Sequence, residues 1–364
     1  MSLFRTSIAD LVPYEPGKPV DAVQRELGLD RVVKLASNEG PFPPFPAALE
    51  AIGRAARDLN RYPDGGSYDL RAALAERHEV AFEEVVVGSG ADGVIDLLSQ
   101  ATLEPGDEIV CGWPSFPSYV LFATKLGGVP RTIPLREHAY DLDALRGEIG
   151  PRTKLVYVCH PNNPTGTANG AGELLSFLDR LPGHVLCVLD QAYFEYIDDP
   201  DYLDGIELHR AGRRLVVLRT FSKIFGLAGL RVGYGIGPAD VVAATSKVRR
   251  AFEVTSTAQA AAIASLGGED EIAARRARNR EGRARLEEIL LGHGLEPARP
   301  ALGNFVFAAV GDGRDVFERL LREGVIVRPL GGFGAPEAIR VTVGTPEENE
   351  LFAVAMGHVL SGVS

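Results

Sequence analysis

The chain has 364 residues, of which 45% are hydrophobic and 24% charged, and its formal net charge is -11 at pH 7. A chain of this length is too long to fold around one ordinary hydrophobic core, so we expect two domains of unequal size. The negative charge argues against nucleic acid or an anionic membrane as the main partner, and no stretch reaches the roughly 18 apolar residues of a membrane span.

The cysteines, the histidines and the N-terminus argue against further classes of protein. Cys111, Cys159 and Cys187 are widely spaced and odd in number, which fits reduced thiols better than a disulfide framework. The N-terminus lacks the apolar region of a signal peptide, so we expect a cytoplasmic protein. The seven histidines form neither an HExxH motif nor a Cys/His cluster, so we expect no metal site.

The first third of the chain predicts an arm, two helices and a phosphate-binding turn. Residues 1–36 are punctuated by prolines and should form an arm that packs on the small domain or on a partner subunit. Helical spacing predicts helices over 46–58 and 68–78. A short apolar strand at 85–87 then leads into the glycine-rich segment 88–93, which opens a helix.

That segment reads G-x-G-x-x-G, in which glycines let the backbone approach a phosphate at a helix N-terminus. The dinucleotide version needs an acidic residue at the end of the next strand. Here the next strand, 108–111, is followed by Gly112-Trp113-Pro114 instead, so a nicotinamide oxidoreductase is rejected. We keep the phosphate-binding interpretation, with backbone amides supplied by Gly90, Ala91 and Asp92.

The centre of the chain alternates strand-like and helical segments, which predicts βαβ units and a mostly parallel sheet. Strands are expected at 129–135, 154–159, 185–189 and 215–218, with a returning strand at 232–236. Ligands of such sheets bind at the carboxyl ends of the strands.

After about residue 240 the pattern changes to a smaller α+β domain. A long helical stretch, 239–293, is broken at Gly267-Gly268. The expected domains are therefore the arm (1–36), a large domain (37–250) and a small domain (251–364). Within the small domain we expect strands at 304–310, 325–328 and 339–343 and helices at 314–323 and 346–359.

The chemistry centres on Lys223, which follows the strand at 215–218. A lysine at the end of a buried strand can have a lowered pKa and form a Schiff base with an aldehyde. Thr220, Ser222 and Arg231 surround it in sequence and could hold a dianionic phosphate. The aldehyde that carries its own phosphate is pyridoxal 5'-phosphate (PLP), so this cofactor is predicted. An isolated Ser-Xaa-Lys would more often be a capping serine and a solvated lysine.

Other strand ends supply the remaining contacts that PLP needs. Asp190 could pair with the ring nitrogen, although an aspartate there could instead cap a helix. Asn163 and Tyr193 suit the ring oxygen, against the alternatives of an Asn-Pro turn and a core tyrosine. Phe116 could stack on the ring or simply pack in the core.

A substrate carboxylate calls for a bidentate arginine. Arg340 and Arg328 each lie on a predicted strand of the small domain, and both are candidates for this contact. The alternative for each is a surface ion pair.

As a set, these motifs resemble the fold-type I PLP-dependent aminotransferases of the histidinol-phosphate/aromatic amino acid (phenylalanine) aminotransferase group. The likeness runs from the Tyr-Glu-Pro-Gly at 14–17 to the Arg-Val-Thr-Val-Gly-Thr-Pro at 340–346. Between these ends the matching motifs are Leu-Ala-Ser-Asn-Glu (35–39), Arg-Tyr-Pro-Asp (61–64), Pro-Asn-Asn-Pro-Thr-Gly (161–166), Asp-Gln-Ala-Tyr (190–193) and Ser-Lys (222–223) with Arg231.

The resemblance implies a large α/β domain with a mostly parallel seven-stranded sheet and a smaller α+β domain. It makes Lys223 the Schiff-base lysine that moves the substrate proton, with Asp190 and Tyr193 assisting. It also implies a homodimer in which Tyr62 reaches the cofactor phosphate of the neighbouring subunit. Tyr14 and Asn38 would border the substrate, and Arg340 would hold its carboxylate.

The substrate is the open point. Gly40, Phe116 and Gln191 depart from residues common in the group, and the first two lie on the substrate side. The segments 112–116 and 219–223 favour the aromatic branch, so we expect transamination between phenylalanine or tyrosine and a 2-oxo acid such as 2-oxoglutarate. The alternatives are histidinol phosphate, with Arg328 near its phosphate, a decarboxylase acting on an amino acid phosphate, and a PLP-binding regulatory domain without turnover.

Overall fold

The computed structural model describes residues 3–9, 11 and 17–361. Its centre is a seven-stranded sheet that is parallel except for one strand, β8, which runs antiparallel to both of its neighbours. The α/β class and the mostly parallel large sheet predicted from the sequence are therefore confirmed. From one edge to the other the strands are β2 (Val85–Gly88), β8 (Gly233–Ile236), β7 (Leu215–Thr220), β6 (Leu186–Asp190), β5 (Thr153–Cys159), β3 (Glu108–Trp113) and β4 (Val129–Pro134).

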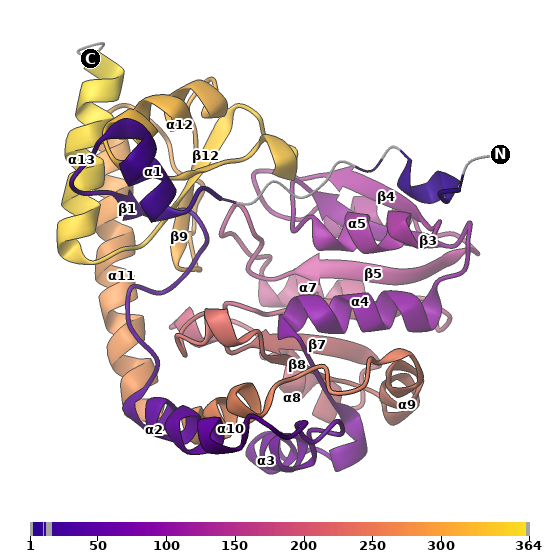
Figure 1. Cartoon of the computed structure of the whole chain (residues 1–364). Helices are drawn as coiled ribbons and strands as arrows, with labels where there is room; N and C mark the ends of the chain where they lie inside the picture. Colours follow the sequence, from indigo (N-terminus) through magenta and orange to yellow (C-terminus); the bar gives the residue numbers. More distant parts are fainter. Residues whose placement is uncertain (1–2, 10, 12–16, 362–364) are drawn as a thin grey trace.

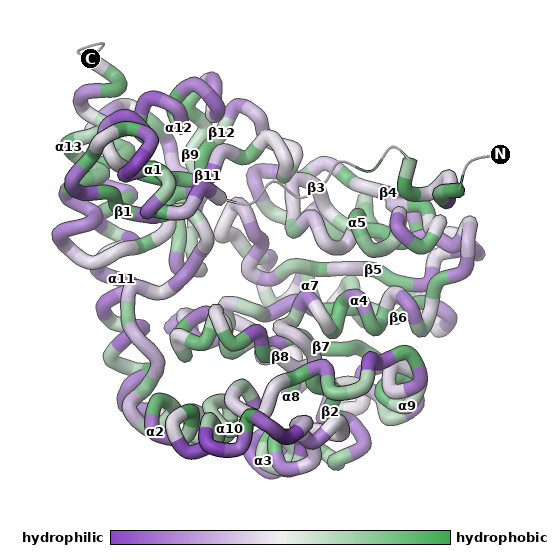
Figure 2. Tube along the Cα trace, in the orientation of Figure 1, coloured by the Kyte–Doolittle hydropathy of each residue, from purple (hydrophilic) through white to green (hydrophobic). Residues whose placement is uncertain are grey.

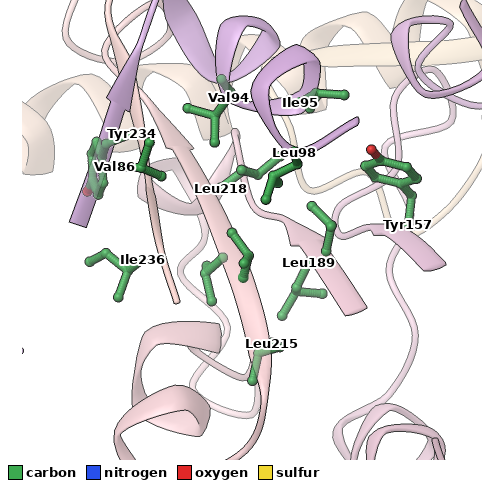
Figure 3. Packing of buried hydrophobic residues seen from close by; sticks show 14 of the residues in the cluster. Val86, Val94, Ile95, Leu98, Tyr157, Leu189, Leu215, Leu218, Tyr234 and Ile236 are labelled. Carbon is green, nitrogen blue, oxygen red and sulfur yellow. The ribbon is translucent and has the colours of Figure 1, made fainter. Parts of the chain in front are cut away.

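Helices pack around this sheet, and the central strands β5, β6 and β7 are buried at every position except Lys154 (Figure 1). Val94 and Leu98 point from α4 toward the strands, as Figure 3 shows. Hydrophobic residues follow the strands in Figure 2. The helices before the long connecting helix are α1 (Val20–Leu27), α2 (Pro46–Ala55), α3 (Tyr68–His78), α4 (Gly90–Thr102), α5 (Ser118–Lys125), α6 (Leu142–Gly147), α7 (Ala171–Asp179), α8 (Gly205–Arg210), α9 (Ala239–Val248) and α10 (Ser256–Ser265).

A second, smaller body carries the C-terminal elements. Its three-stranded antiparallel sheet has the order β11-β12-β9, and a two-stranded parallel sheet joins β1 (Val33–Lys34) to β10. The elements are α11 (Glu269–Gly292), β9 (Phe305–Ala309), α12 (Gly313–Arg322), β10 (Val325–Ile326), β11 (Arg328–Pro329), β12 (Ala338–Thr342) and α13 (Pro346–Ser361).

The N-terminal segment belongs to this smaller body. Val23 of α1, Val33 of β1 and Leu35 share one hydrophobic cluster with residues of α11, α12 and α13. Figure 1 shows α1 and β1, in indigo, beside the yellow C-terminal helices. A separate, larger cluster fills the space around the seven-stranded sheet and includes Ala258 and Ala262 of α10. The domain boundaries at 36/37 and 250/251 remain predictions.

The helical stretch expected over 239–293 is three helices, α9, α10 and α11. The break at Gly267-Gly268 is present, between α10 and α11. A second break follows α9, where Phe252 takes a left-handed backbone conformation (φ 58°). Thr255 then starts α10 by accepting a hydrogen bond from the Ala258 amide. The sequence prediction missed this second break because Phe252 is not a residue type that marks a turn.

The expected strand at 325–328 is two short strands that join different sheets, β10 with β1 and β11 with β12. In the described part of the chain, no helix is long and apolar enough to cross a membrane. Within the same residues, no group of three or more His, Cys, Asp or Glu side chains is arranged to hold a metal ion.

Candidate active site

The carboxyl ends of three adjacent strands meet at one edge of the large sheet. Cys159 at the end of β5 pairs with Asp190 at the end of β6, and Asp190 pairs in turn with Leu218 of β7. The polar residues that follow these strands therefore come together, as parallel-sheet geometry requires. They line a cavity of about 270 Å³ whose walls include the predicted residues Asn38, Gly90, Ala91, Asp92, Phe116, Asn163, Asp190, Tyr193, Thr220, Ser222, Lys223, Arg231, Arg328 and Arg340.

Lys223 points its amine into this cavity. Its Nζ donates a hydrogen bond to the backbone oxygen of Asn38 at 3.2 Å and lies 5.6 Å from the centre of the Tyr193 ring. Burial, reinforced by the positive charge of Arg340, lowers the pKa of Lys223 from 10.5 to about 7. A large fraction of this amine is therefore uncharged at neutral pH.

Asp190 is the buried carboxylate of the site, with 4% of its surface exposed. Its Oδ2 accepts a hydrogen bond from the Tyr119 hydroxyl at 2.6 Å, and its Oδ1 accepts one from the Ala192 amide at 3.0 Å. Burial raises the pKa of Asp190, and these two hydrogen bonds oppose that rise by stabilising the ionised form.

A hydrogen-bonded group of side chains forms the wall between the large sheet and β12. The Tyr193 hydroxyl accepts a hydrogen bond from Asn38 Nδ2 at 2.8 Å. Arg340, on β12 and 4% exposed, donates to Asn163 Oδ1 and to the backbone oxygen of Ala36. Arg328 stands directly opposite Arg340 in the pairing of β11 with β12. Two guanidinium groups therefore belong to the same wall.

A turn at the start of α4 gathers several hydrogen-bond donors that suit an anion. Gly90 adopts a positive φ of 76°, and a Cβ atom there would come within 2.9 Å of Arg231 Nη2. Arg231 in turn donates to the Ser222 hydroxyl at 3.3 Å, and the Ser222 amide donates to Thr220 Oγ1 at 3.1 Å. A guanidinium, two hydroxyls and the N-terminus of a 13-residue helix thus converge on one point.

The sequence matches one protein family along most of its length. The model for aminotransferase class I and II matches residues 30–356. The chain belongs to this family.

Individual aminotransferases similar to this chain carry more specific names. A histidinol-phosphate aminotransferase of Anaeromyxobacter sp. (strain Fw109-5) is 45% identical, over 99% of this chain and 100% of that protein. An aromatic amino acid aminotransferase of Thermobifida fusca (strain YX) is also 45% identical, over 96% of this chain and 94% of that protein. The solved histidinol-phosphate aminotransferase of Sinorhizobium meliloti, in complex with pyridoxal-5'-phosphate, superimposes with a TM-score of 0.91 at 30% identity, covering 100% of this chain and 99% of that one.

Two of the predicted residues of this aminotransferase are not placed in the cavity. Tyr62 lies on the surface, 81% exposed, with its ring stacked on Phe252 at 4.5 Å. Tyr14 lies outside the described residues.

The prediction from the sequence missed Tyr119, although this residue contacts the Asp190 carboxylate. Its position on a helix next to other apolar residues gave no signal beyond core packing. It also missed Asn304, whose side-chain amide donates to the same Asn38 oxygen that accepts from Lys223. Both contacts join residues far apart in the chain, so no local pattern could reveal them.

Proposed function

We propose that this chain transfers an amino group between histidinol phosphate and a 2-oxo acid, using PLP as cofactor. The observation that carries the choice of substrate is the pairing of Arg328 with Arg340 on one cavity wall. Two adjacent guanidiniums suit a phosphate or dicarboxylate group, and an aromatic amino acid offers only one carboxylate. The sequence motifs favoured the aromatic substrate, whereas the relatives named for histidinol phosphate, including the solved one from Sinorhizobium, support the alternative.

The cavity fits PLP. The turn at Gly90 leaves room for an anion where any side chain would strike Arg231, which suits the cofactor phosphate. Asp190 would face the ring nitrogen, with Asn163 and Tyr193 at the ring oxygen and Phe116 on one ring face. PLP, when bound, supplies an aldehyde that reacts with amines and a ring that withdraws electrons from the substrate Cα.

Lys223 would accept and return the substrate proton. Its amine has a pKa of about 7, and the hydrogen bond to the Asn38 oxygen holds the amine in place. An uncharged Nζ can accept the Cα proton, and the ammonium so formed can return it to the adjacent carbon. Tyr193, held by Asn38 Nδ2, gives this side of the cavity a fixed hydroxyl.

In the cofactor-free protein, the reactivity of Lys223 should rise with pH around a midpoint near 7, because its pKa is lowered to about 7. Below this midpoint the amine is protonated and cannot attack a carbonyl, and above it the free base accumulates. Reductive methylation by formaldehyde, followed by mass spectrometry of the peptide that carries Lys223, measures this profile. A midpoint near that of free lysine, about 10.4, would contradict the lowered pKa.

Substrate choice is tested by single-turnover absorbance measurements on the purified holoenzyme, with histidinol phosphate, phenylalanine and glutamate added separately. We expect histidinol phosphate and glutamate to convert the cofactor to its aminated form rapidly. Replacing Arg328 with Gln should lower kcat/KM for histidinol phosphate roughly 10- to 100-fold, because a charge-assisted hydrogen bond to the phosphate is lost. Phenylalanine, whose single carboxylate carries one negative charge where the phosphate carries nearly two, should be affected much less.

The second candidate is the aromatic aminotransferase activity, which the Thermobifida relative supports by its name. Phe116 and Phe333 offer apolar wall to an aromatic side chain. Rapid conversion by phenylalanine with none by histidinol phosphate would establish this candidate and overturn the first. Loss of carbon dioxide without any exchange of amino groups would instead identify a decarboxylase.

We also propose that the chain works as a homodimer. Leu59, Tyr62, Tyr68 and Phe252 are large hydrophobic side chains that are 45% or more exposed, and Tyr62 stacks on Phe252. An aromatic pair of this kind fits a subunit interface better than open solvent. From there Tyr62 would reach the cofactor phosphate of the neighbouring subunit. Sedimentation equilibrium at micromolar concentration checks the stoichiometry, and a monomer would contradict the proposal.

A further inference from the structure

Tyr119 is a buried phenol whose hydroxyl meets the central carboxylate of the site. It lies in the first turn of α5 and has 0% of its surface exposed. Its hydroxyl donates to Asp190 Oδ2 at 2.6 Å, a short distance that is typical of a hydrogen bond to an ionised acceptor. The other carboxylate oxygen has its own donor, the Ala192 amide. Asp190 therefore has one donor on each oxygen.

Neighbouring rings fix Tyr119 in this position. Its ring stacks on Tyr157 with centroids 4.4 Å apart and an interplanar angle of 12°. Phe116, the proposed stacking partner of the cofactor ring, meets Tyr119 edge-on at 5.7 Å. Tyr157, labelled in Figure 3, is itself buried, and its hydroxyl lies 3.3 Å from Ser99 Oγ. These ring contacts hold Tyr119 with its hydroxyl directed at Asp190.

Tyr119 is also a donor that does not titrate in the working range. Burial, and next to it the charge of Asp190, raises the pKa of Tyr119 well above its usual value. The hydroxyl therefore keeps its proton at neutral pH. A permanent neutral donor stabilises the ionised form of a carboxylate and lowers its affinity for a proton.

We propose that Tyr119 is a positioning residue that keeps Asp190 ionised and oriented, so that the proton shared with the cofactor ring nitrogen stays on the nitrogen. The proposal rests on PLP as the cofactor. A protonated ring nitrogen makes the ring a stronger acceptor of electrons from the substrate Cα. Without the Tyr119 hydroxyl, Asp190 becomes the better base, and the proton moves toward the carboxylate.

The test uses holoenzyme loaded with PLP that carries 15N at the ring nitrogen. In the wild type we expect the 15N signal at the position of a protonated pyridine. Tyr119→Phe should move it toward the neutral position and slow the exchange of the substrate Cα hydrogen with solvent roughly tenfold, because one hydrogen bond to a charged group is lost. Tyr157→Phe is the matched control, since it removes a buried hydroxyl from the adjacent ring without touching Asp190. It should leave both readouts unchanged.

An unchanged 15N signal in Tyr119→Phe would overturn the proposal, as would an equal shift in Tyr157→Phe. If Tyr119→Phe does not fold, Tyr119→3-fluorotyrosine keeps the shape and strengthens the donor. Its signal must then stay at the protonated position or move further from the neutral one, and movement toward the neutral position would overturn the proposal. A wild type that binds no PLP contradicts the proposed function instead, so the two failures are distinguishable.

Discussion

Replacing Lys223 with alanine is expected to abolish transamination, with a fall in kcat of roughly 10³- to 10⁴-fold or more. The variant loses the only amine that lines the described cavity, and with it the group that carries the substrate proton. The fold should persist, because the Lys223 side chain lines the cavity and its amine donates a hydrogen bond to the Asn38 backbone oxygen. Single-turnover kinetics and near-ultraviolet absorbance of the bound cofactor measure the effect. Lys247→Ala, on the exposed side of α9, is the control and should keep wild-type rates.

The same variant tests whether the active sites are shared between subunits. Tyr62→Ala should weaken cofactor binding without affecting Lys223 of its own chain. If Tyr62 acts on the neighbouring subunit, a mixed dimer of Lys223→Ala and Tyr62→Ala contains one site with both defects and one intact site. Random re-pairing of equal amounts should then restore about a quarter of the wild-type sites. If the re-paired mixture is no more active than the average of the two variants, the active sites are not shared. If Lys223→Ala alone keeps more than 1% of wild-type activity, Lys223 does not carry the substrate proton.

The sequence predicted the cavity well because its parts lie at the ends of buried strands. Asp190, Thr220 and the segment after Cys159 each follow an apolar run, and parallel strands bring their carboxyl ends to one edge. Their convergence is thus a consequence of periodicity and topology. The glycine-rich start of α4 could be interpreted in the same way, since a positive φ at Gly90 needs glycine.

The prediction failed where contacts depend on tertiary packing. The two-residue strand β1, which was not predicted, carries too few residues to show a period, and it exists because it pairs with β10. Tyr119 resembled a core aromatic because its hydroxyl finds a partner 71 residues away. The choice of substrate, which remains a proposal, depends on tertiary structure in the same way. The local motifs pointed to the aromatic branch, but Arg328 and Arg340 become one feature only through the pairing of β11 with β12.

Arg219 is a charged residue that is almost fully buried, with 2% of its surface exposed, within strand β7. Its guanidinium donates to Asp204 at 2.6 Å and to Gln191 Oε1 at 3.1 Å, and it lies 3.4 Å above the Phe194 ring. Glu195 is 3.6 Å away. These partners follow Asp190 in the chain, and Arg219 immediately precedes Thr220. The guanidinium therefore ties together the two segments that carry the site.

We expect Arg219→Met to lower the free energy of unfolding by about 3–5 kcal/mol, because it leaves buried carboxylate charge without its cation. Urea denaturation at several pH values measures this loss. Burial raises the pKa of Glu195, and Arg219 opposes that rise. In the variant the Arg219 charge no longer lowers the pKa of Glu195, so the folded-state pKa of Glu195 rises further above its unfolded value. The destabilisation caused by ionised Glu195 is therefore fully present at a pH above the folded-state pKa of this residue. It diminishes as the pH falls toward the unfolded-state pKa, because Glu195 then becomes protonated and neutral.

The loss of stability in Arg219→Met should accordingly be larger at pH 8 than at pH 5.5. Arg214→Met is the matched control, since Arg214 also pairs with an aspartate, Asp240, but both side chains are more than half exposed. An exposed pair contributes about 0–1 kcal/mol, so this variant should unfold close to the wild type at both pH values. A small, pH-independent effect in Arg219→Met would show that the buried network does not depend on its cation. A large effect confined to Arg219→Met would establish that the strand ends bearing Asp190 and Lys223 are held together by buried charge.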